Sequence, residues 1–306
     1  MPRTELCREQ GRSPPLFPTQ FGTRTSAVVV NYNAREALVA CVASLRAAGV
    51  VEVVVADNAS ADGSDRALAV ADPAARFLPT GANLGYGAAA NRGVAATTGD
   101  LVLICNPDVV VEPGSVAALV AALEADPALA LVGPRLADGD GHLYPSPRRF
   151  PGIGEAVGHA FLGLVAPGNR YTRRYRMLDD DRAQAGDAEW VSGACFLARR
   201  RAWDALGGFD EAYFMYAEDV DLCWRARRAG WRVGFEPAAR VVHLQGVSTD
   251  LVPYRMILRH HRSLLRFFRR SASPAGRLMM PVVAAGLAVR AGLACGHHRL
   301  AGRRGR

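Results

Sequence analysis

The chain has 306 residues, half of them hydrophobic, which is enough for one large core with an appendage. Its net charge of +8 is unevenly spread, because residues 255–306 contain 12 arginines and no acid, whereas the preceding part carries 25 arginines and 29 acids. The six cysteines form no CxxC pair, which argues against a structural zinc site and suits buried free thiols. The first residues lack the pattern of a secretory signal, and we expect a cytoplasmic protein.

The first half of the chain predicts a sheet covered by helices. Residues 1–23 are rich in proline, glycine and polar residues and predict a disordered leader. Apolar strands then alternate with alanine-rich helical patterns, which is typical of a parallel sheet with helices on both faces. The expected strands are 26–32, 50–56, 76–79, 101–105 and 128–133, and the expected helices are 35–48, 85–98 and 116–125.

The second half is mixed. Residues 138–187 show no regular pattern, residues 191–198 and 232–235 predict strands, and residues 219–229 predict a helix between them. We therefore expect a single α/β domain, with a mostly parallel central sheet flanked by helices, over residues 24–253.

Polar clusters follow three of the expected strands. Ligands bind beyond the carboxyl ends of parallel strands, so clusters at successive strand ends together predict a ligand site. Each cluster alone is equally well explained as turn chemistry. The first strand is not followed by GxGxxG, which argues against a dinucleotide-binding dehydrogenase and favours a nucleotide held by side chains and a metal. The clusters are Asn31-Tyr32-Asn33, Asp57-Asn58 and Asn106-Pro107-Asp108.

Three acids, Glu218, Asp219 and Asp221, follow an aromatic cluster and begin a helical pattern. The helix dipole stabilises acids in a first turn, and this is the structural explanation. Asp219 and Asp221 are two positions apart and do not share a helix face, which leaves a structural role open for one of them. A carboxylate beside aromatic rings also suits a sugar-transferring site, which needs a proton acceptor.

Five segments in order resemble family 2 glycosyltransferases of GT-A fold. The last of them is the acceptor-side motif and is most similar to the rhamnosyltransferase branch. The resemblance covers roughly residues 25–270 and implies a GT-A domain with a nucleotide-sugar half at 24–135 and an acceptor half at 136–253. The segments are VVVNYN (28–33), DNASADGS (57–64), NLGYGAAANRG (83–93), NPD (106–108) and GGFDEAYFMYAEDVD (207–221).

The resemblance also implies roles in donor binding. Asp57 is expected to bind the imide of a pyrimidine base. Asn31 and Tyr32 are expected to line the base and ribose pocket, and Asn83 and Asn91 to shape the nucleotide loop.

A metal is implied by the NPD segment, which occupies the place of the family's DxD motif but has Asn106 at its first position. Hard divalent cations prefer charged oxygen ligands, so Asp108 becomes the main protein ligand for Mg²⁺ or Mn²⁺. A Pro-Asp turn is the structural alternative. His243 stands where related enzymes have a metal-binding histidine, although a lone histidine is commonly just a satisfied polar residue.

On the acceptor side, the resemblance makes Asp219 the general base, with Glu218 supporting acceptor or metal geometry. Asp221 and Trp190 are expected near the acceptor, and Trp190 suits a core position equally well. The implied activity is inverting transfer of L-rhamnose from dTDP-L-rhamnose to N-acetylglucosaminyl-diphospho-polyprenol. The alternatives are another donor (UDP-galactofuranose, UDP-glucose or GDP-mannose) and an inactive nucleotide-sugar-binding membrane scaffold.

Residues 254–306 predict a basic amphipathic helical tail. Residues 278–289 form its longest uncharged run, which is too short to span a bilayer. We expect peripheral association with the anionic inner face of the cell membrane. A solvated helix packed on the domain is the alternative, and no nucleic-acid-binding motif accompanies the charge. One face of the first helix is expected to carry Arg255, Arg259, Arg262, Arg266 and Arg269.

Overall fold

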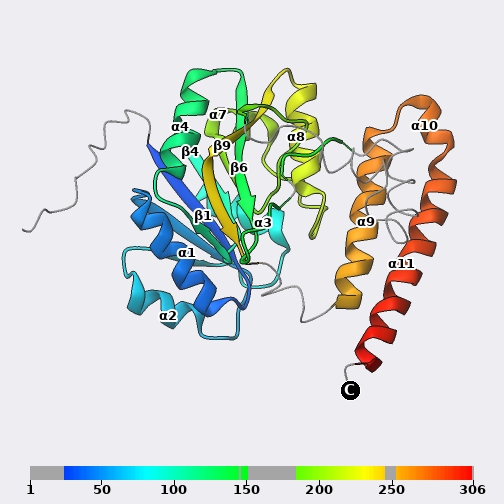
Figure 1. Cartoon of the computed structure of the whole chain (residues 1–306), viewed down its shortest axis with the longest axis horizontal. Helices are drawn as coiled ribbons and strands as arrows, with labels where there is room; N and C mark the ends of the chain where they lie inside the picture. Colours follow the sequence, from blue (N-terminus) through cyan, green and yellow to red (C-terminus); the bar gives the residue numbers. More distant parts are fainter. Residues whose placement is uncertain (1–23, 145, 151–183, 245–252, 305–306) are drawn as a thin grey trace, which may run out of the picture.

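The computed structural model describes residues 24–144, 146–150, 184–244 and 253–304 (Figure 1). The leader predicted for the first 23 residues therefore lies outside the described residues, as does the greater part of the predicted irregular stretch.

The described strands form one sheet in the order β3-β2-β1-β4-β8-β6-β9-β5, with β7 paired to β9. The pairings among β3, β2, β1 and β4 are parallel, as the sequence predicts. β8 is antiparallel to both β4 and β6, and β9 is antiparallel to β5 and β7, so the sheet as a whole is mixed rather than mostly parallel. The strands are β1 (Thr25–Asn31), β2 (Glu52–Asp57), β3 (Arg76–Pro79), β4 (Leu101–Cys105), β5 (Val109–Val111), β6 (Leu129–Ala137), β7 (Gly186–Asp187), β8 (Cys195–Arg199) and β9 (Arg232–His243).

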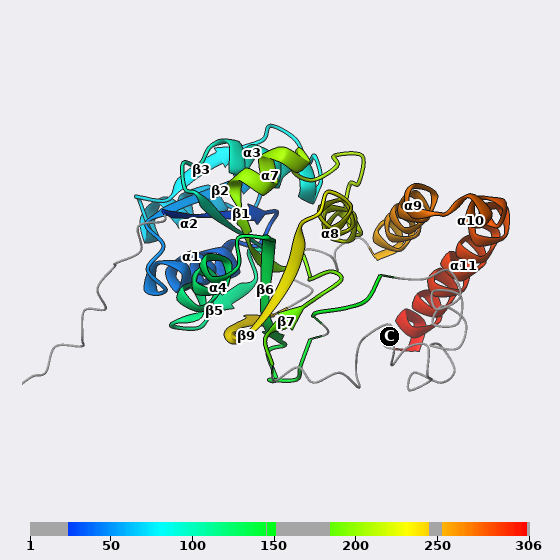
Figure 2. The same cartoon turned by 90° about the horizontal axis from the view of Figure 1, so that it is seen from above.

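Helices cover both faces of this sheet and enclose two cores. In β1, Ala27 and Val29 belong to one core and Val28 and Val30 to the other, since neighbouring side chains of a strand alternate between faces. The expected α/β architecture is confirmed. The first face carries α1 (Arg35–Ala47), α2 (Ser64–Ala71) and α4 (Ser115–Ala125), and the second carries α3 (Tyr86–Ala95), α7 (Arg200–Leu206) and α8 (Glu218–Arg228) (Figure 2).

Strand β9 is longer than predicted. The sequence predicts a strand over residues 232–235, whereas the structure continues it to His243. Its register against β6 shifts where the partner changes from Glu236 to Arg240. This bulge takes up the residues between them and lets the strand continue to His243.

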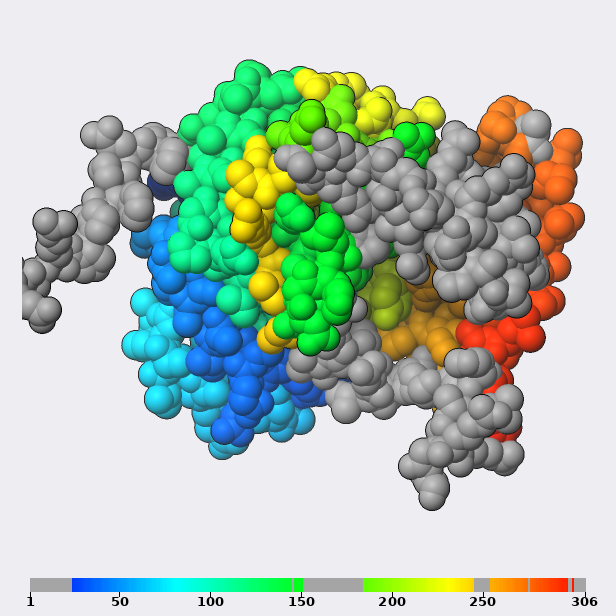
Figure 3. Space-filling view, in the orientation of Figure 1, coloured from blue at the N-terminus to red at the C-terminus, as the bar shows by residue number. Residues whose placement is uncertain are grey.

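The C-terminal segment forms three helices: α9 (Pro253–Ser271), α10 (Pro274–Leu278) and α11 (Met280–Arg304). Helix α9 stands beside α8, with α11 on its other side, and the surface of α9 is visible between the α/β domain and α11 (Figures 1 and 3). Within the described residues, no helix is long and apolar enough to cross a membrane.

Helix α9 is docked on the domain. Phe267 is 1% exposed and belongs to a domain core, where its ring stacks on Phe150 at 6.3 Å. Arg266 and Arg270 pair with Asp210 at 2.9 and 2.7 Å. Part of the basic face predicted to meet solvent or membrane therefore faces the domain instead.

The cysteines agree with the sequence in the described part of the chain. All five there are free thiols, and the buried ones are Cys41, Cys105, Cys195 and Cys223.

Candidate active site

A cavity of about 630 Å³ lies at the carboxyl ends of β1 and β4, as the strand-end rule predicts. The loop before α8, the end of β9 and the first turns of α9 complete its wall. Eight of the predicted site residues line it: Tyr32, Asn83, Asn106, Asp108, Trp190, Glu218, Asp219 and His243.

The predicted metal ligands meet on one side of the cavity. The short strand β5 follows Asp108 and pairs antiparallel with the end of β9, which brings His243 opposite Val109. The His243 Nε2 atom lies 3.3 Å from Asp108 Oδ1 and 3.1 Å from Asn106 Nδ2. Two residues separated by more than a hundred positions are thus held in contact by one strand pairing.

This cluster fits a divalent cation. Asp108 Oδ1 and His243 Nδ1 are buried and have no hydrogen-bond partner among the described residues. When Asn106 donates to His243 Nε2, that nitrogen presents no proton to Asp108, so two acceptors face each other. A cation held by the Asp108 carboxylate, and by His243 Nε2 in place of its bond from Asn106, would relieve this arrangement, and both groups are accepted ligands of Mn²⁺-type ions.

The Asp219 carboxylate is fixed by two backbone donors. Gly193 N–H donates to Oδ2 and Val220 N–H donates to Oδ1, both at 2.8 Å. Burial raises the pKa of Asp219, while these two bonds and the charge of Arg148 lower it. The result is an oriented carboxylate with a raised pKa, which is the property of a general base.

Glu218 is 6% exposed, and its Oε2 has no hydrogen-bond partner among the described residues. Burial raises its pKa well above the ordinary value, and the charge of Asp219 raises it further. Of these two neighbouring acids, Glu218 is therefore the one that holds a proton more readily.

The loop that presents these acids is strained. Tyr216 and Ala217 both adopt positive φ angles, of 70° and 63°, which non-glycine residues rarely do. Tyr86 N–H donates to the Phe214 carbonyl at 2.9 Å and ties this loop to α3. Gly85 lies against the same carbonyl at φ 92°, where an added Cβ atom would collide with the oxygen.

Asn31 and Asp57 lie behind the cavity wall. They are 0% and 3% exposed, and Asn31 Nδ2 donates to Asp57 Oδ1 at 2.8 Å. The Asp57 carboxylate also accepts bonds from the Ser60 backbone and hydroxyl. Its Oδ2 atom accepts only the Ser60 backbone N–H and keeps a second acceptor site, so direct binding of a base by Asp57 stays a prediction.

Two predicted site residues are built into the scaffold. Asn91 bonds to the backbone N–H and carbonyl of Phe209 at 2.9 Å and so joins α3 to the acceptor-side segment. Asp221 is fully buried and pairs with Arg225 at 2.6 Å inside α8. Neither lines the cavity, so the predicted acceptor contact of Asp221 is replaced by a structural ion pair.

Trp190 is 4% exposed, and its predicted contact with the acceptor stays a prediction. Its indole N–H donates to the Arg149 carbonyl at 2.8 Å, and it lines the cavity as part of a core. The Arg148 guanidinium lies 5.0 Å from the Trp190 ring centroid and 5.4 Å from that of Tyr144. Arg148 was missed because it sits in a stretch without periodicity.

Helix α9 supplies further cavity residues that the sequence did not predict: Arg255, Arg259 and His260. The arginines were assigned to a membrane-facing surface because helical spacing shows which residues share a face, but not what that face meets.

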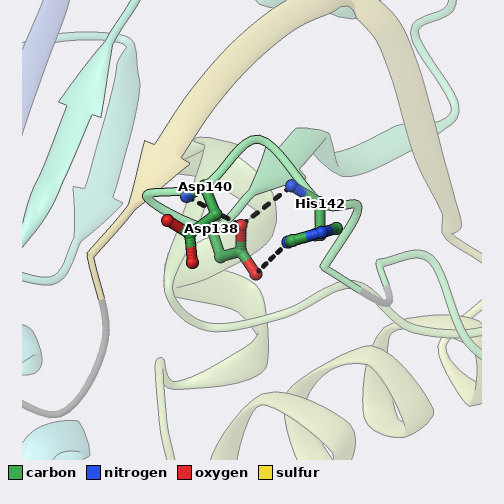
Figure 4. Close-up of side chains that lie close together, drawn as sticks. All are labelled: Asp138, Asp140 and His142. Atoms are coloured by element: carbon green, nitrogen blue, oxygen red, sulfur yellow. Dashed lines mark hydrogen bonds and ion pairs between the residues drawn. The ribbon is translucent and has the colours of Figure 1, made fainter.

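A second group of potential ligands lies outside the cavity. Asp138, Asp140 and His142 have ligand atoms within 4.8 Å of one another (Figure 4). The Asp138 carboxylate accepts bonds from the backbone N–H groups of both Asp140 and His142, and two of the three residues are exposed. This is a carboxylate-stabilised turn.

Comparison with known proteins places this site in a family. Residues 26–207 match the sequence model of glycosyl transferase family 2, and residues 164–292 match that of glycosyl transferase family group 2. The chain belongs to glycosyl transferase family 2 and is a glycosyltransferase.

Among curated relatives, the N-acetylglucosaminyl-diphospho-decaprenol L-rhamnosyltransferase of Mycobacterium tuberculosis is 42% identical over 230 residues, which cover 71% of this chain and 74% of that protein. Rhamnosyltransferase WbbL of Escherichia coli is 28% identical over 125 residues, which cover 41% of this chain and 44% of that protein.

Solved structures confirm the fold. The mannosyltransferase PcManGT from Pyrobaculum calidifontis, solved with GDP-Man and Mn²⁺, superposes with a TM-score of 0.58 at 18% identity, covering 90% of this chain and 76% of that one. GalNAc-T7, solved with UDP, GalNAc and Mn²⁺, superposes with a TM-score of 0.54 at 16% identity, covering 73% of this chain and 43% of that one.

Proposed function

We propose that the protein transfers L-rhamnose from dTDP-L-rhamnose to a hydroxyl of N-acetylglucosaminyl-diphospho-polyprenol, with inversion at the anomeric carbon. The observation that carries this is the Asp219 carboxylate, held by two backbone N–H groups in the same cavity as the Asp108–His243 pair. The relative that is 42% identical supplies the sugar and the acceptor class.

Asp219 is the general base. It accepts the proton of the acceptor hydroxyl as the hydroxyl oxygen attacks the anomeric carbon. The N–H groups of Gly193 and Val220 hold the carboxylate in one orientation. Glu218 beside it takes the protonated form more readily, so the pair need not carry two charges at once.

Asp108 and His243 would hold Mg²⁺ or Mn²⁺, and such an ion would neutralise charge on the departing diphosphate. Solved neighbours of the same fold that contain Mn²⁺ support a divalent metal of this kind.

The nucleotide lies against Tyr32, Asn58 and Asn83, which line the cavity beyond β1 and β2. Asn31 and Asp57 lie behind this wall and are joined by a hydrogen bond. Asp57 recognises the imide of the pyrimidine base.

The tail brings the enzyme to the anionic inner face of the cell membrane. Three apolar side chains of α11, Val282, Val289 and Leu293, are more than half exposed and recur at helical spacing. Arg277 and Arg299 are exposed at either end of this apolar surface. An apolar stripe flanked by arginines suits binding in the plane of the interface.

A donor screen tests the proposal. Purified protein is incubated with dTDP-rhamnose, UDP-galactofuranose, UDP-glucose or GDP-mannose, together with a short-chain N-acetylglucosaminyl-diphosphoryl lipid. We expect product from dTDP-rhamnose alone. Product from another donor would redirect the assignment within the family. Donor binding without transfer or hydrolysis would support the inactive scaffold.

A further inference from the structure

One wall of the active-site cavity is positively charged. It is built from the first turns of α9, which contribute Arg255, Arg259 and His260, and from Arg148 on the neighbouring segment. The Arg259 guanidinium lies 3.3 Å from the centroid of the Phe214 ring, next to the loop that carries Asp219.

The arginines of this wall repel one another. Burial lowers the pKa of Arg259, and Arg255 lowers it further. Burial also lowers the pKa of His260 to about 4, with additional contributions from His261, Arg290 and Arg148, so its imidazole is neutral and offers a ring N–H rather than a charge. Within the described residues, no ion pair joins Arg255 or Arg259 to a carboxylate. Converging like charges destabilise the free protein, and a bound polyanion would reverse that cost.

The acids of the cavity do not pair with Arg255 or Arg259 among the described residues. Asp108 belongs to the metal pair, and Glu218 and Asp219 form the base pair. Arg255 and Arg259 are therefore available to a ligand, and guanidinium groups suit phosphate oxygens in particular.

We propose that Arg148, Arg255, Arg259 and His260 form the binding site for the diphosphate of the acceptor. This rests on the proposed function, in which the acceptor is a sugar diphosphate linked to a lipid. The diphosphate is then one sugar ring away from the attacking hydroxyl, so it must enter the same cavity as Asp219. The charge of Arg148 lowers the pKa of Asp219. A cation therefore lies near the carboxylate, about where the diphosphate of the acceptor must be bound.

The geometry also provides an exit for the lipid. Leu258 lies on α9 between the two arginines and is 47% exposed. The neighbouring helix α11, which packs on α9, also exposes apolar side chains. A chain leaving the diphosphate site can therefore follow the tail towards the membrane surface.

The first test measures anion binding without requiring activity. Inorganic pyrophosphate is titrated into the full-length protein, with excess dTDP and Mg²⁺ occupying the donor site. The double variant Arg255→Gln/Arg259→Gln should bind pyrophosphate about 10- to 100-fold more weakly, since charge-assisted hydrogen bonds to phosphate are lost. Arg255→Lys/Arg259→Lys should retain most of the binding.

The matched control is Arg262→Gln/Arg269→Gln, which removes the same charge from exposed positions of α9 that do not line the cavity. It should bind pyrophosphate like the wild type. Equal losses in both double variants, or no loss in either, would overturn the proposal.

The second test separates acceptor from donor. Arg255→Gln/Arg259→Gln should raise KM about 10- to 100-fold for a short-chain N-acetylglucosaminyl-diphosphoryl lipid. KM for dTDP-rhamnose and for an alkyl N-acetylglucosaminide without phosphate should stay unchanged. An equal rise for dTDP-rhamnose would assign the arginines to the donor and overturn the proposal. If the wild type transfers no sugar, the proposed function fails, and the pyrophosphate titration alone supports or overturns the anion site.

Discussion

Neighbouring carboxylates in this site have different roles because they have different hydrogen-bond and ion-pair partners. Asp219 accepts two backbone N–H bonds and opens onto the cavity, whereas Asp221 is closed off by Arg225. Glu218, between the cavity and the core, lacks a partner for Oε2 among the described residues and has a strongly raised pKa. One short stretch thus supplies the proposed base, a structural ion pair and a readily protonated neighbour.

The raised pKa of Asp219 predicts the pH dependence of transfer. The base works only when it is deprotonated, so kcat should fall as the pH falls through the raised pKa, at a higher pH than for an ordinary aspartate. Because Arg148 lowers that pKa, Arg148→Gln should move the acidic limb to still higher pH. A pH profile of kcat at saturating acceptor tests this, and an acidic limb that shifts down or stays in place would contradict it.

The metal pair predicts a selective loss of metal-dependent affinity. Asp108→Ala and His243→Ala should each weaken dTDP binding in Mn²⁺ by about 10-fold or more, because each removes one ligand. In EDTA the variants and the wild type should bind dTDP alike. Asp138→Ala is the control, since it disrupts the exposed acidic turn outside the cavity. If Mn²⁺ strengthens dTDP binding in Asp108→Ala as much as in the wild type, Asp108 is a turn residue and not a metal ligand.

At the scale of elements, the site depends on how α3 holds the loop before α8. Two consecutive positive φ angles at Tyr216 and Ala217 persist because Gly85 and Tyr86 pack against Phe214. A loop held in this way places Asp219 without making it mobile.

Gly85→Ala should therefore displace the loop and lower kcat by about 100-fold, in line with the effect of small misplacements of reacting groups. Gly81→Ala is matched to it, because Gly81 has a similar φ of 81° but open space around its Cβ position. Circular dichroism should show both variants folded. A loss of kcat in Gly81→Ala as large as in Gly85→Ala would attribute the effect to backbone strain alone.

Local patterns predicted most of the first half of the fold and the residues that follow its strands. Asp108 and Asp219 were found from strand ends and from acids beside aromatic residues. The antiparallel partners of β8 and β9 could not be read in this way, because pairing is non-local and a bulge divides β9. Arg148 and Arg255 were missed as cavity residues because no local spacing shows which surface a helix or loop meets.

At the scale of the whole molecule, the catalytic domain and the tail share the cavity. Phe267 anchors α9 in a domain core, and Asp210 holds Arg266 and Arg270. Helix α11 packs on α9 and exposes apolar and basic side chains to the outside. One assembly can then present the base, the donor pocket and a surface for a lipid-linked substrate.

Deleting residues 272–306 separates these contributions. The deletion keeps α9 with its anchors, so transfer to a water-soluble acceptor should persist. Binding to anionic vesicles should fall but not vanish, because each arginine near such a surface is worth on the order of 1 kcal/mol and those of α9 remain. Co-sedimentation at low and high salt measures this, since salt screens the attraction. Unchanged vesicle binding would reject α10 and α11 as the membrane contact.

The central claim is that Asp219 accepts the proton of the attacking hydroxyl, and Asp219→Asn tests it most directly. The amide keeps the shape of the side chain but removes the base. The account predicts that kcat for rhamnosyl transfer falls by roughly 10²- to 10⁴-fold, while dTDP binding in Mn²⁺ stays close to that of the wild type. Near-normal turnover of the folded variant would contradict the account.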